Sequence, residues 1–326
     1  MKLGTLNLVN RYILAPMQNV TTGPYRRFCR KFQEIGLVSV PMLYSKRIVK
    51  NPETIVYDLQ KIEEERPISV QIIGSEPRSL RESLNYLESY NFDVLDINAG
   101  CPSKRAIKAK EGGYLLKDLE SLEELINIAV KYNSRPVSLK IRTGFENTNN
   151  IKELARIANS SGIDFLTIHA RPVKCNFDSA SLDLNAVKEL KENLIIPLVG
   201  NGDIISPIAA KKFIDYTNVD ALMIGRESMG NPQIFNQIHE FFTKGKEIKF
   251  SNDLGKMKQR ISLYKRCLDE FLNGIILPNA IKDYKFIELK RNSIWLTKNI
   301  KNSTRIRSEL SKTRNFEQLK LILQNL

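Results

Sequence analysis

The sequence lacks the segments that would carry a chain into or across a membrane. No apolar run approaches the roughly 20 residues of a membrane-spanning helix. The N-terminal stretch MKLGTLNLVNRY has neither the apolar centre nor the cleavage site of a secretory signal. We therefore expect a cytoplasmic protein.

Cysteine and histidine, the usual ligands of structural zinc, are scarce. The four cysteines are widely separated without a C-x-x-C pair, and no histidine spacing matches them. These spacings support neither a zinc site nor a disulfide framework, so we expect reduced thiols and no bound metal. The cysteines are Cys29, Cys101, Cys175 and Cys267.

Acidic residues are outnumbered by basic ones. The chain has 50 Lys and Arg against 36 Asp and Glu, a formal net charge of +14, and a pI near 9.5. A basic excess of this size is compatible with a nucleic-acid substrate. A general bias towards lysine would also produce it, so the position of the charge matters more than its total.

A Gly-rich first turn, typical of doubly wound nucleotide-binding sheets, is missing as well. The chain instead alternates short apolar runs with amphipathic stretches, which indicates parallel β-α-β units. Eight such runs predict an α/β fold, a (β/α)8 TIM barrel over residues 1–242. The runs are residues 12–15, 37–42, 67–73, 92–97, 136–141, 164–168, 195–199 and 220–224.

After Phe242 the alternation stops. Residues 254–271, 279–299 and 303–326 have helical periodicity without strand-like runs, and cations cluster between residues 282 and 307. These stretches predict a small all-helical C-terminal domain over residues 250–326. We expect the whole chain to be a monomer.

Residues 91–105, NFDVLDINAGCPSKR, bring a cysteine to the end of a predicted strand. The strand leads to Asn98, and Cys101 follows at the place where ligands meet the strands of a parallel barrel. Lys104 and Arg105 add positive charge beside the sulfur. For a cysteine taken at random, packing in a loop is the better interpretation. This position and these neighbours favour chemistry.

Other predicted strand ends also carry polar or flexible residues. Each alone has an ordinary explanation, such as a core histidine or a turn glycine, but their recurrence at one end of the barrel favours a ligand site. Glycines after the last two strands would admit a phosphate to backbone N–H groups. Lys140 and His169 would contact a flat polar ring, and Gln71 would read its amide edge. This combination has the shape of FMN.

Seven segments between Leu14 and Phe235 stand out in order: APMQNVTTGPYRRFCR, VQIIGSEP, DINAGCPSKR, KIRTGF, HARP, VGNGDI and MIGRESMGNPQIF. Together they make the sequence similar to the tRNA-dihydrouridine synthases, a flavin-dependent family. The resemblance implies a barrel that holds FMN, NADPH as the reductant, and a helical domain that holds tRNA. Residues 286–300, FIELKRNSIWLTKNI, are similar to the basic helix of that domain.

The same resemblance implies roles for individual residues. Reduced FMN would give hydride to C6 of a tRNA uridine, and the Cys101 thiol would give C5 its proton. The flavin site would comprise Pro16, Met17, Gln18, Gln71, Lys140, His169, Asn201, Gly202, Asp203, Gly225 and Arg226, the last five around the phosphate. We expect tRNA contacts from Asn98, Lys104, Arg105, Arg171, Lys290, Arg291, Lys298, Arg305 and Arg307.

Three departures from the family pattern bear on these expectations. Lys110 stands where members often have glycine, the run from Pro172 to Cys175 replaces Thr-Arg-x-Gln, and Asn292 stands where histidine is common. Two other functions stay open. One is an FMN barrel that acts on a small molecule, similar to dihydroorotate dehydrogenase, although it would not explain the basic helical region. The other is a catalytically impaired RNA-binding relative.

Overall fold

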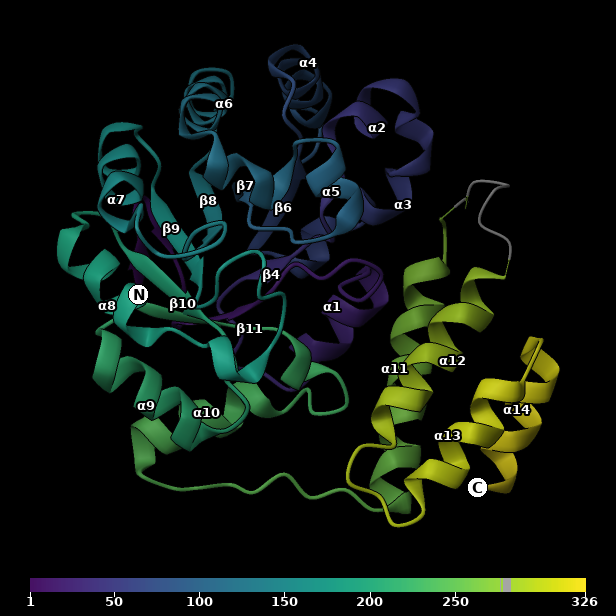
Figure 1. Ribbon diagram of the computed structural model, residues 1–326. Helices are drawn as coiled ribbons and strands as arrows, with labels where there is room; N and C mark the ends of the chain where they lie inside the picture. Colours follow the sequence, from purple (N-terminus) through teal and green to yellow (C-terminus); the bar gives the residue numbers. More distant parts are fainter. Residues whose placement is uncertain (276, 278–282) are drawn as a thin grey trace.

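A computed structural model describes residues 1–275, 277 and 283–326 of the chain. Its parallel strands form a nearly closed barrel in the order β3-β11-β10-β9-β8-β7-β6-β4, with β5 also paired to β6 (Figure 1). A bridge from Ile13 to Leu37 brings the two edges together. The predicted barrel is therefore confirmed, although the second predicted strand, residues 37–42, is shortened to β4, and β5 follows just after it. The strands are β3 (Tyr12–Leu14), β4 (Val38–Ser39), β5 (Leu43–Tyr44), β6 (Ile68–Ile73), β7 (Val94–Ala99), β8 (Val137–Arg142), β9 (Phe165–His169), β10 (Leu198–Asn201) and β11 (Ala221–Ile224).

Helices cover the outside of the barrel and explain the periodicities of the sequence. Every residue of β6 and β7 is buried, as expected for strands that lie between a packed interior and a helical layer. The longest of these covering helices, α6, buries Leu122, Leu125 and Ile126 on a single face. The helices are α1 (Gly23–Arg30), α2 (Ser45–Lys50), α3 (Val56–Leu59), α4 (Pro77–Leu87), α5 (Lys104–Lys108), α6 (Leu119–Lys131), α7 (Ile151–Ser160), α8 (Leu184–Asn193), α9 (Pro207–Thr217) and α10 (Ile234–Lys244).

A short hairpin covers the end of the barrel where the strands begin. It consists of β1 (Lys2–Leu3) and β2 (Leu6–Asn7), which pair antiparallel. Asp164, directly before β9, accepts hydrogen bonds from the Thr5 N–H at 3.0 Å and from the Thr5 hydroxyl at 2.6 Å. Leu3 joins the apolar cluster inside the barrel. Because this end is filled, a ligand site is left to the end where the strands finish.

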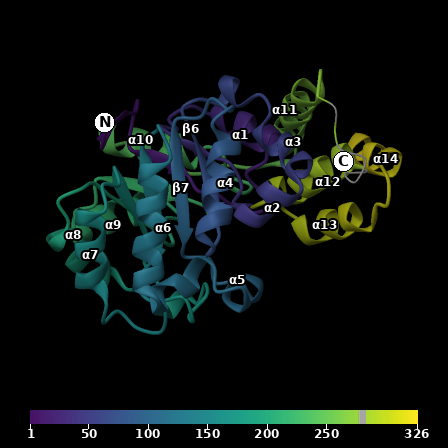
Figure 2. The same cartoon turned by 90° about the horizontal axis from the view of Figure 1, so that it is seen from above.

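Four further helices lie together on one side of the barrel (Figure 2). They are α11 (Leu254–Leu272), α12 (Tyr284–Leu296), α13 (Ser303–Lys312) and α14 (Phe316–Asn325). The predicted helix over 279–299 begins in residues 279–282, which lie outside the described part of the chain. The rest of that prediction, and the helical character of the C-terminal region, are confirmed.

The C-terminal helices pack tightly on the barrel. A Cβ added at Gly23 of α1 would lie 2.1 Å from a ring carbon of Phe271 in α11. The rings of Phe28 and Tyr264 meet edge to face with centroids 5.4 Å apart. One buried apolar cluster includes residues of both parts. The division into domains at residues 242 and 250 therefore stays a prediction.

Several absences can be stated for the described residues. No helix there has both the length and the apolar character of a membrane span. No group of three or more metal-ligating side chains is found among these residues either. All four cysteines are free: Cys29 and Cys267 are buried, and Cys101 and Cys175 are half-buried.

Candidate active site

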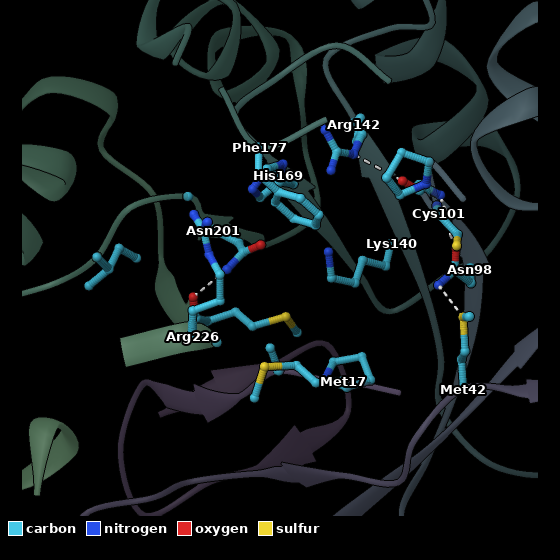
Figure 3. Close-up of a pocket in the computed structure, with 18 of the residues that line it drawn as sticks. Met17, Met42, Asn98, Cys101, Lys140, Arg142, His169, Phe177, Asn201 and Arg226 are labelled. Carbon is cyan, nitrogen blue, oxygen red and sulfur yellow. Dashed lines mark hydrogen bonds between the residues drawn. The ribbon is translucent and has the colours of Figure 1, made fainter. Parts of the chain in front are cut away.

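A cavity of about 610 Å³ opens at the end of the barrel where the strands finish (Figure 3). All the residues predicted to bind the flavin line it, together with Cys101 and Asn98. The parallel register explains this gathering, since His169 lies between Arg142 of β8 and Asn201 of β10. The other lining residues are Ala15, Met42, Gly100, Pro102, Arg142, Phe177, Ile204, Ile205, Met223 and Glu227.

Cys101 lies on the wall of the cavity, just past β7. Its backbone N–H donates to Asn98 Oδ1 at 2.9 Å, and its thiol donates to Ser103 Oγ at 3.4 Å. Ser103 also caps α5 by accepting from the Ala106 N–H at 3.2 Å. A Cβ at Gly112, where φ is +60°, would lie 2.9 Å from Cys101 Cβ, so glycine is needed for this approach. The cysteine is thus held from both sides.

The loop after α5 holds Lys110 in a backbone conformation that glycine favours. This lysine adopts a φ of 58°, in the left-handed region that glycine favours. Its N–H still donates to the Ile107 carbonyl at 3.1 Å. The lysine therefore supplies the backbone conformation expected of the glycine it replaces.

Lys140 and His169 extend from neighbouring strands into the cavity, and both have displaced pKa values. Burial and the nearby Arg142 lower the pKa of Lys140 to about 8, while Asp96 acts in the opposite direction. Burial, followed by Lys140 and Arg142, holds the pKa of His169 far below its ordinary value, so the imidazole is neutral at pH 7. Among the described residues, its buried Nδ1 has no hydrogen-bond partner.

The Pro172–Cys175 departure does not disorganise its loop. Arg142 donates to the Pro172 carbonyl at 3.0 Å and to the Asn176 carbonyl at 2.6 Å. Arg171 donates to the Asp178 carbonyl at 2.6 Å. Buried guanidinium groups from two strand ends therefore hold the loop by its backbone carbonyls.

Residues after β10 and β11 form the side of the cavity predicted to hold phosphate. Asn201 Nδ2 donates to the Met223 carbonyl at 2.7 Å, which joins the two strand ends. Gly202 has a φ of +135°, a conformation that side chains rarely adopt. Asp203 pairs with Arg226 at 2.9 Å and also with Arg171. Because Asp203 is itself anionic, we expect it to orient the arginines.

The chemistry of these groups fits a flat cofactor that ends in a phosphate. In Figure 3, Asn201 and Arg226 lie on one side, Cys101 and Asn98 on the other, and Lys140 between them. The Arg226 side chain is 58% exposed, so its cation is accessible beside the phosphate side. The unpartnered Nδ1 of His169 and the Lys140 amine offer polar contacts to a ring.

Phe177 is a wall residue that sequence reasoning missed. Its side chain is 53% exposed. The ring lies between the guanidinium groups of Arg142 and Arg226, at 5.2 and 5.0 Å from its centroid. It also meets His169 edge to face at 6.0 Å. Its position depends on the loop that Arg142 and Arg171 hold, and no local pattern in the sequence signals that.

The predicted tRNA-contacting residues are not all at the surface. Arg171 is completely buried. Lys290 donates to the carbonyls of Ser311 at 2.8 Å and Thr313 at 2.6 Å. These bonds support internal roles for both side chains in place of contact with RNA.

Two further cations of the C-terminal helices also have partners inside the protein. Arg291 pairs with the buried Glu288. Lys298 pairs at 2.7 Å with Glu227, a wall residue of the cavity. Arg305 and Arg307 on α13 are exposed, although Arg305 pairs with Glu309 of the same helix at 2.9 Å.

The remaining members of the predicted tRNA set lie near Cys101. Lys104 and Arg105 are exposed on α5. The Arg105 guanidinium lies 4.2 Å from the centroid of the Tyr44 ring. Asn292, the third departure, is buried on α12 and donates to the Glu288 carbonyl at 3.0 Å. A side chain in that position packs inside the helical region, away from solvent.

Comparison with known proteins gives consistent relatives. The family model described as Dihydrouridine synthase (Dus) matches residues 13–325. The chain is 38% identical over 245 residues to tRNA-dihydrouridine synthase B of Pasteurella multocida (strain Pm70), covering 75% of this chain and 73% of that protein. It is 33% identical over 272 residues to tRNA-dihydrouridine synthase B of Escherichia coli (strain K12), covering 83% and 84%.

Solved structures resemble the chain in fold. Morphinone reductase superposes with a TM-score of 0.53 at 12% identity, covering 77% of this chain and 90% of that one. Histamine dehydrogenase from Rhizobium sp. 4-9 superposes with a TM-score of 0.60 at 11% identity, covering 82% and 50%. At these identities the likeness concerns the barrel alone.

Proposed function

This chain belongs to the dihydrouridine synthase family, and from that premise we propose how its cavity works. The protein is a flavin-dependent oxidoreductase, a tRNA-dihydrouridine synthase. We assign FMN as the flavin, because the cavity has a ring side and a single phosphate side. When bound, FMN supplies the hydride for C6 of a uracil ring, and we assign NADPH as the reductant that restores it.

Chain residues would hold the cofactor from three directions. Pro16, Met17 and Gln18, after β3, would line it. Hydrogen bonds to its ring would come from Lys140, Gln71 and His169. Its phosphate would be bound by the backbone N–H groups of Gly202 and Gly225 and by the side chains of Asn201 and Arg226. Asp203 would keep Arg226 in place through their ion pair.

Cys101 would be the acid that completes the reduction. Hydride at C6 leaves C5 in need of a proton, so the S–H bond of Cys101 breaks as the C5–H bond forms, and solvent then returns a proton to the sulfur. The observation that carries this role is the thiol's setting on the cavity wall. Among the described residues it hydrogen-bonds to a neutral hydroxyl, and no histidine or carboxylate is bonded to it that would make it a nucleophile.

The substrate would approach over α5 and the C-terminal helices. Lys104 and Arg105 lie on the helix that directly follows Cys101, where they can contact phosphates beside the target uridine. Asn98, in the wall next to Cys101, would contact the base itself. Arg305 and Arg307 would extend the contact along α13. The target base must leave its stack to reach the cavity, and a tRNA substrate is consistent with a cytoplasmic location.

A complementation experiment tests this function. In a strain that lacks its own enzyme, the wild-type chain should restore dihydrouridine to tRNA, and the purified protein should show flavin absorbance. R226A should lose most of both, because the phosphate side loses its exposed cation. R78A removes an arginine that is 84% exposed on α4 and should change neither. Bound flavin without dihydrouridine in tRNA would instead favour a small-molecule oxidoreductase or an impaired relative.

A further inference from the structure

Asp96 is a buried carboxylate that the reaction above does not use. It lies in β7, the strand that leads to Cys101, and its side chain is only 4% exposed. Burial raises its pKa to about 6, opposed by hydrogen bonds from Ser138 and Gln71 and by the nearby Lys140. A charged group in a barrel interior costs free energy unless hydrogen bonds compensate. The hydrogen-bond partners of Asp96 therefore indicate what role it has.

Those partners form a continuous chain of hydrogen bonds from Asp96 to Cys101. The Ser138 hydroxyl donates to Asp96 Oδ1 at 2.7 Å, and Gln71 Nε2 donates to Asp96 Oδ2 at 2.7 Å. Asn98 Nδ2 donates to Gln71 Oε1 at 2.9 Å. Asn98 Oδ1 accepts from the backbone N–H of Cys101 at 2.9 Å and of Gly100 at 3.1 Å.

Every bond in this chain donates towards Asp96. At one end the carboxylate can only accept, and at the other end the backbone N–H groups can only donate. The two amides between them therefore have one orientation that satisfies all the bonds. The strand register places Gln71, Asp96 and Ser138 side by side on β6, β7 and β8, so the chain follows from the fold.

We propose that Asp96 is a positioning residue that fixes the orientation of the Gln71 and Asn98 amides and, through them, the backbone of Cys101. The catalytic meaning of this proposal rests on the proposed role of Cys101 as the acid. Without the acceptor at Asp96, both amides could invert together. Asn98 would then present an N–H donor to the N–H groups of Gly100 and Cys101, and the loop that carries the thiol would have to move.

Substitutions can reverse the chain without breaking it. In N98D the Gln71 amide lies between two carboxylates, that of Asp96 and the one introduced at position 98. Its nitrogen can donate to one of them, so the other must face the Gln71 carbonyl oxygen, and two acceptors then repel each other. Adding D96N removes the conflict. The amide introduced at position 96 then donates to Gln71 Oε1, and Gln71 Nε2 donates to the carboxylate introduced at position 98, which still accepts from Cys101 and Gly100. D96N alone is mild, since its amide nitrogen can donate to Ser138 while its oxygen still accepts from Gln71.

The first experiment measures the unfolding midpoint of the flavin-loaded protein at pH 5 and pH 8. N98D should lose stability at pH 8 and regain part of it at pH 5, where one carboxylate takes a proton. D96N/N98D should be more stable than N98D at pH 8 and lack that regain. The control N98D/D93N removes a half-buried carboxylate that pairs with Arg66 and takes no part in these hydrogen bonds. It should not restore the stability that N98D loses at pH 8. Independent, additive effects of D96N and N98D would overturn the proposal.

The second experiment connects the chain to Cys101. D96A should slow dihydrouridine formation in a single turnover by roughly tenfold or more, within the range of measured couplings between hydrogen-bonded neighbours. Flavin reduction by NADPH should slow by less than this, because it depends on Gln71 but not on the Cys101 backbone, and D96N should stay within about threefold of wild type in both steps. Equal behaviour of D96A and D96N would refute the proposal. If D96A does not fold, the stability of D96N/N98D compared with N98D tests the proposal by itself. That result does not depend on the role of Cys101.

Discussion

The cations of α5 and those of α12 have the same chemistry but different surroundings. Lys104, Arg105 and Lys108 are exposed on α5, and none of them is in an ion pair within the described residues. Lys290 and Arg291 on α12 are half-buried, and their N–H groups bond to carbonyls and to a carboxylate. The free cations lie beside Cys101, and the bonded ones hold the C-terminal helices together.

A basic cluster in the sequence is therefore not in itself a nucleic-acid surface. An exposed cation attracts phosphate and releases counterions when it binds. A cation already bonded inside the protein must first give up those bonds. We therefore expect the attraction of tRNA to be concentrated near the cavity, and α12 to contribute mainly stability.

Among the cations compared, the largest expected effect is that of the α5 residues on tRNA affinity. K104E/R105E should weaken binding roughly tenfold or more and reduce the slope of log affinity against log salt by about 2, one for each lost phosphate contact. K290A is the matched control from α12. It should leave the salt slope unchanged and lower the unfolding midpoint. If instead K290A reduces the salt slope and K104E/R105E does not, the RNA contacts lie on α12.

Lys140 is a cation of a third kind, because it faces the cofactor side of the cavity. Flavin affinity should weaken by roughly five- to tenfold as pH rises through about 8, since the amine loses the charge that strengthens its hydrogen bonds to acceptor atoms of the ring. Fluorescence titration at pH 7 and pH 9 measures this. K140Q should bind flavin weakly at both pH values, with no slope between them. If the flavin affinity of K140Q still falls between pH 7 and pH 9, a group other than Lys140 is responsible for the pH dependence.

The same shift has a stability consequence of known sign. The pKa of Lys140 is about 8 in the folded protein against an ordinary value of 10.5. Between these values the unfolded chain binds the proton more readily, so the contribution of Lys140 to the unfolding free energy rises with pH across this window. In flavin-free protein, K140Q should remove that part of the rise.

The smallest expected effect concerns Lys298, which lies just past α12 and pairs with a residue of the cavity wall. Its ion pair with Glu227 is partly exposed, so K298A should cost about 1 kcal/mol or less, a shift of about 2–4 °C in the unfolding midpoint. The exchanged pair E227K/K298E should recover part of the loss. If K298A instead leaves the midpoint unchanged and reduces the salt slope for tRNA, Lys298 belongs with the α5 cations.

Much of the barrel could be predicted from the sequence because both faces of its strands are buried. Runs such as residues 67–73 and 92–97 are mostly apolar for that reason, and they bring Gln71 and Cys101 to the cavity. The second strand was harder, since β4 and β5 are two residues each. Short segments of this kind depend on their neighbours more than on their own pattern.

The remaining features depend on partners that are distant in the sequence. Asp96 bonds to Gln71 and Ser138 across two strand pairs, which the register alone decides. Lys298 meets a carboxylate 71 residues away. A helical pattern of basic residues gives the type of side chain but not its partner, so burial and pairing had to come from the structure.

The role of Cys101 as the acid is tested by single-turnover dihydrouridine formation with flavin-reduced C101A. The variant should retain flavin and be reduced by NADPH like wild type, yet form dihydrouridine in tRNA roughly 100-fold or more slowly, since it lacks the acid that protonates C5. C101S, which keeps a weaker O–H donor, should be slow as well. Dihydrouridine formation by C101A at the wild-type rate would contradict the account.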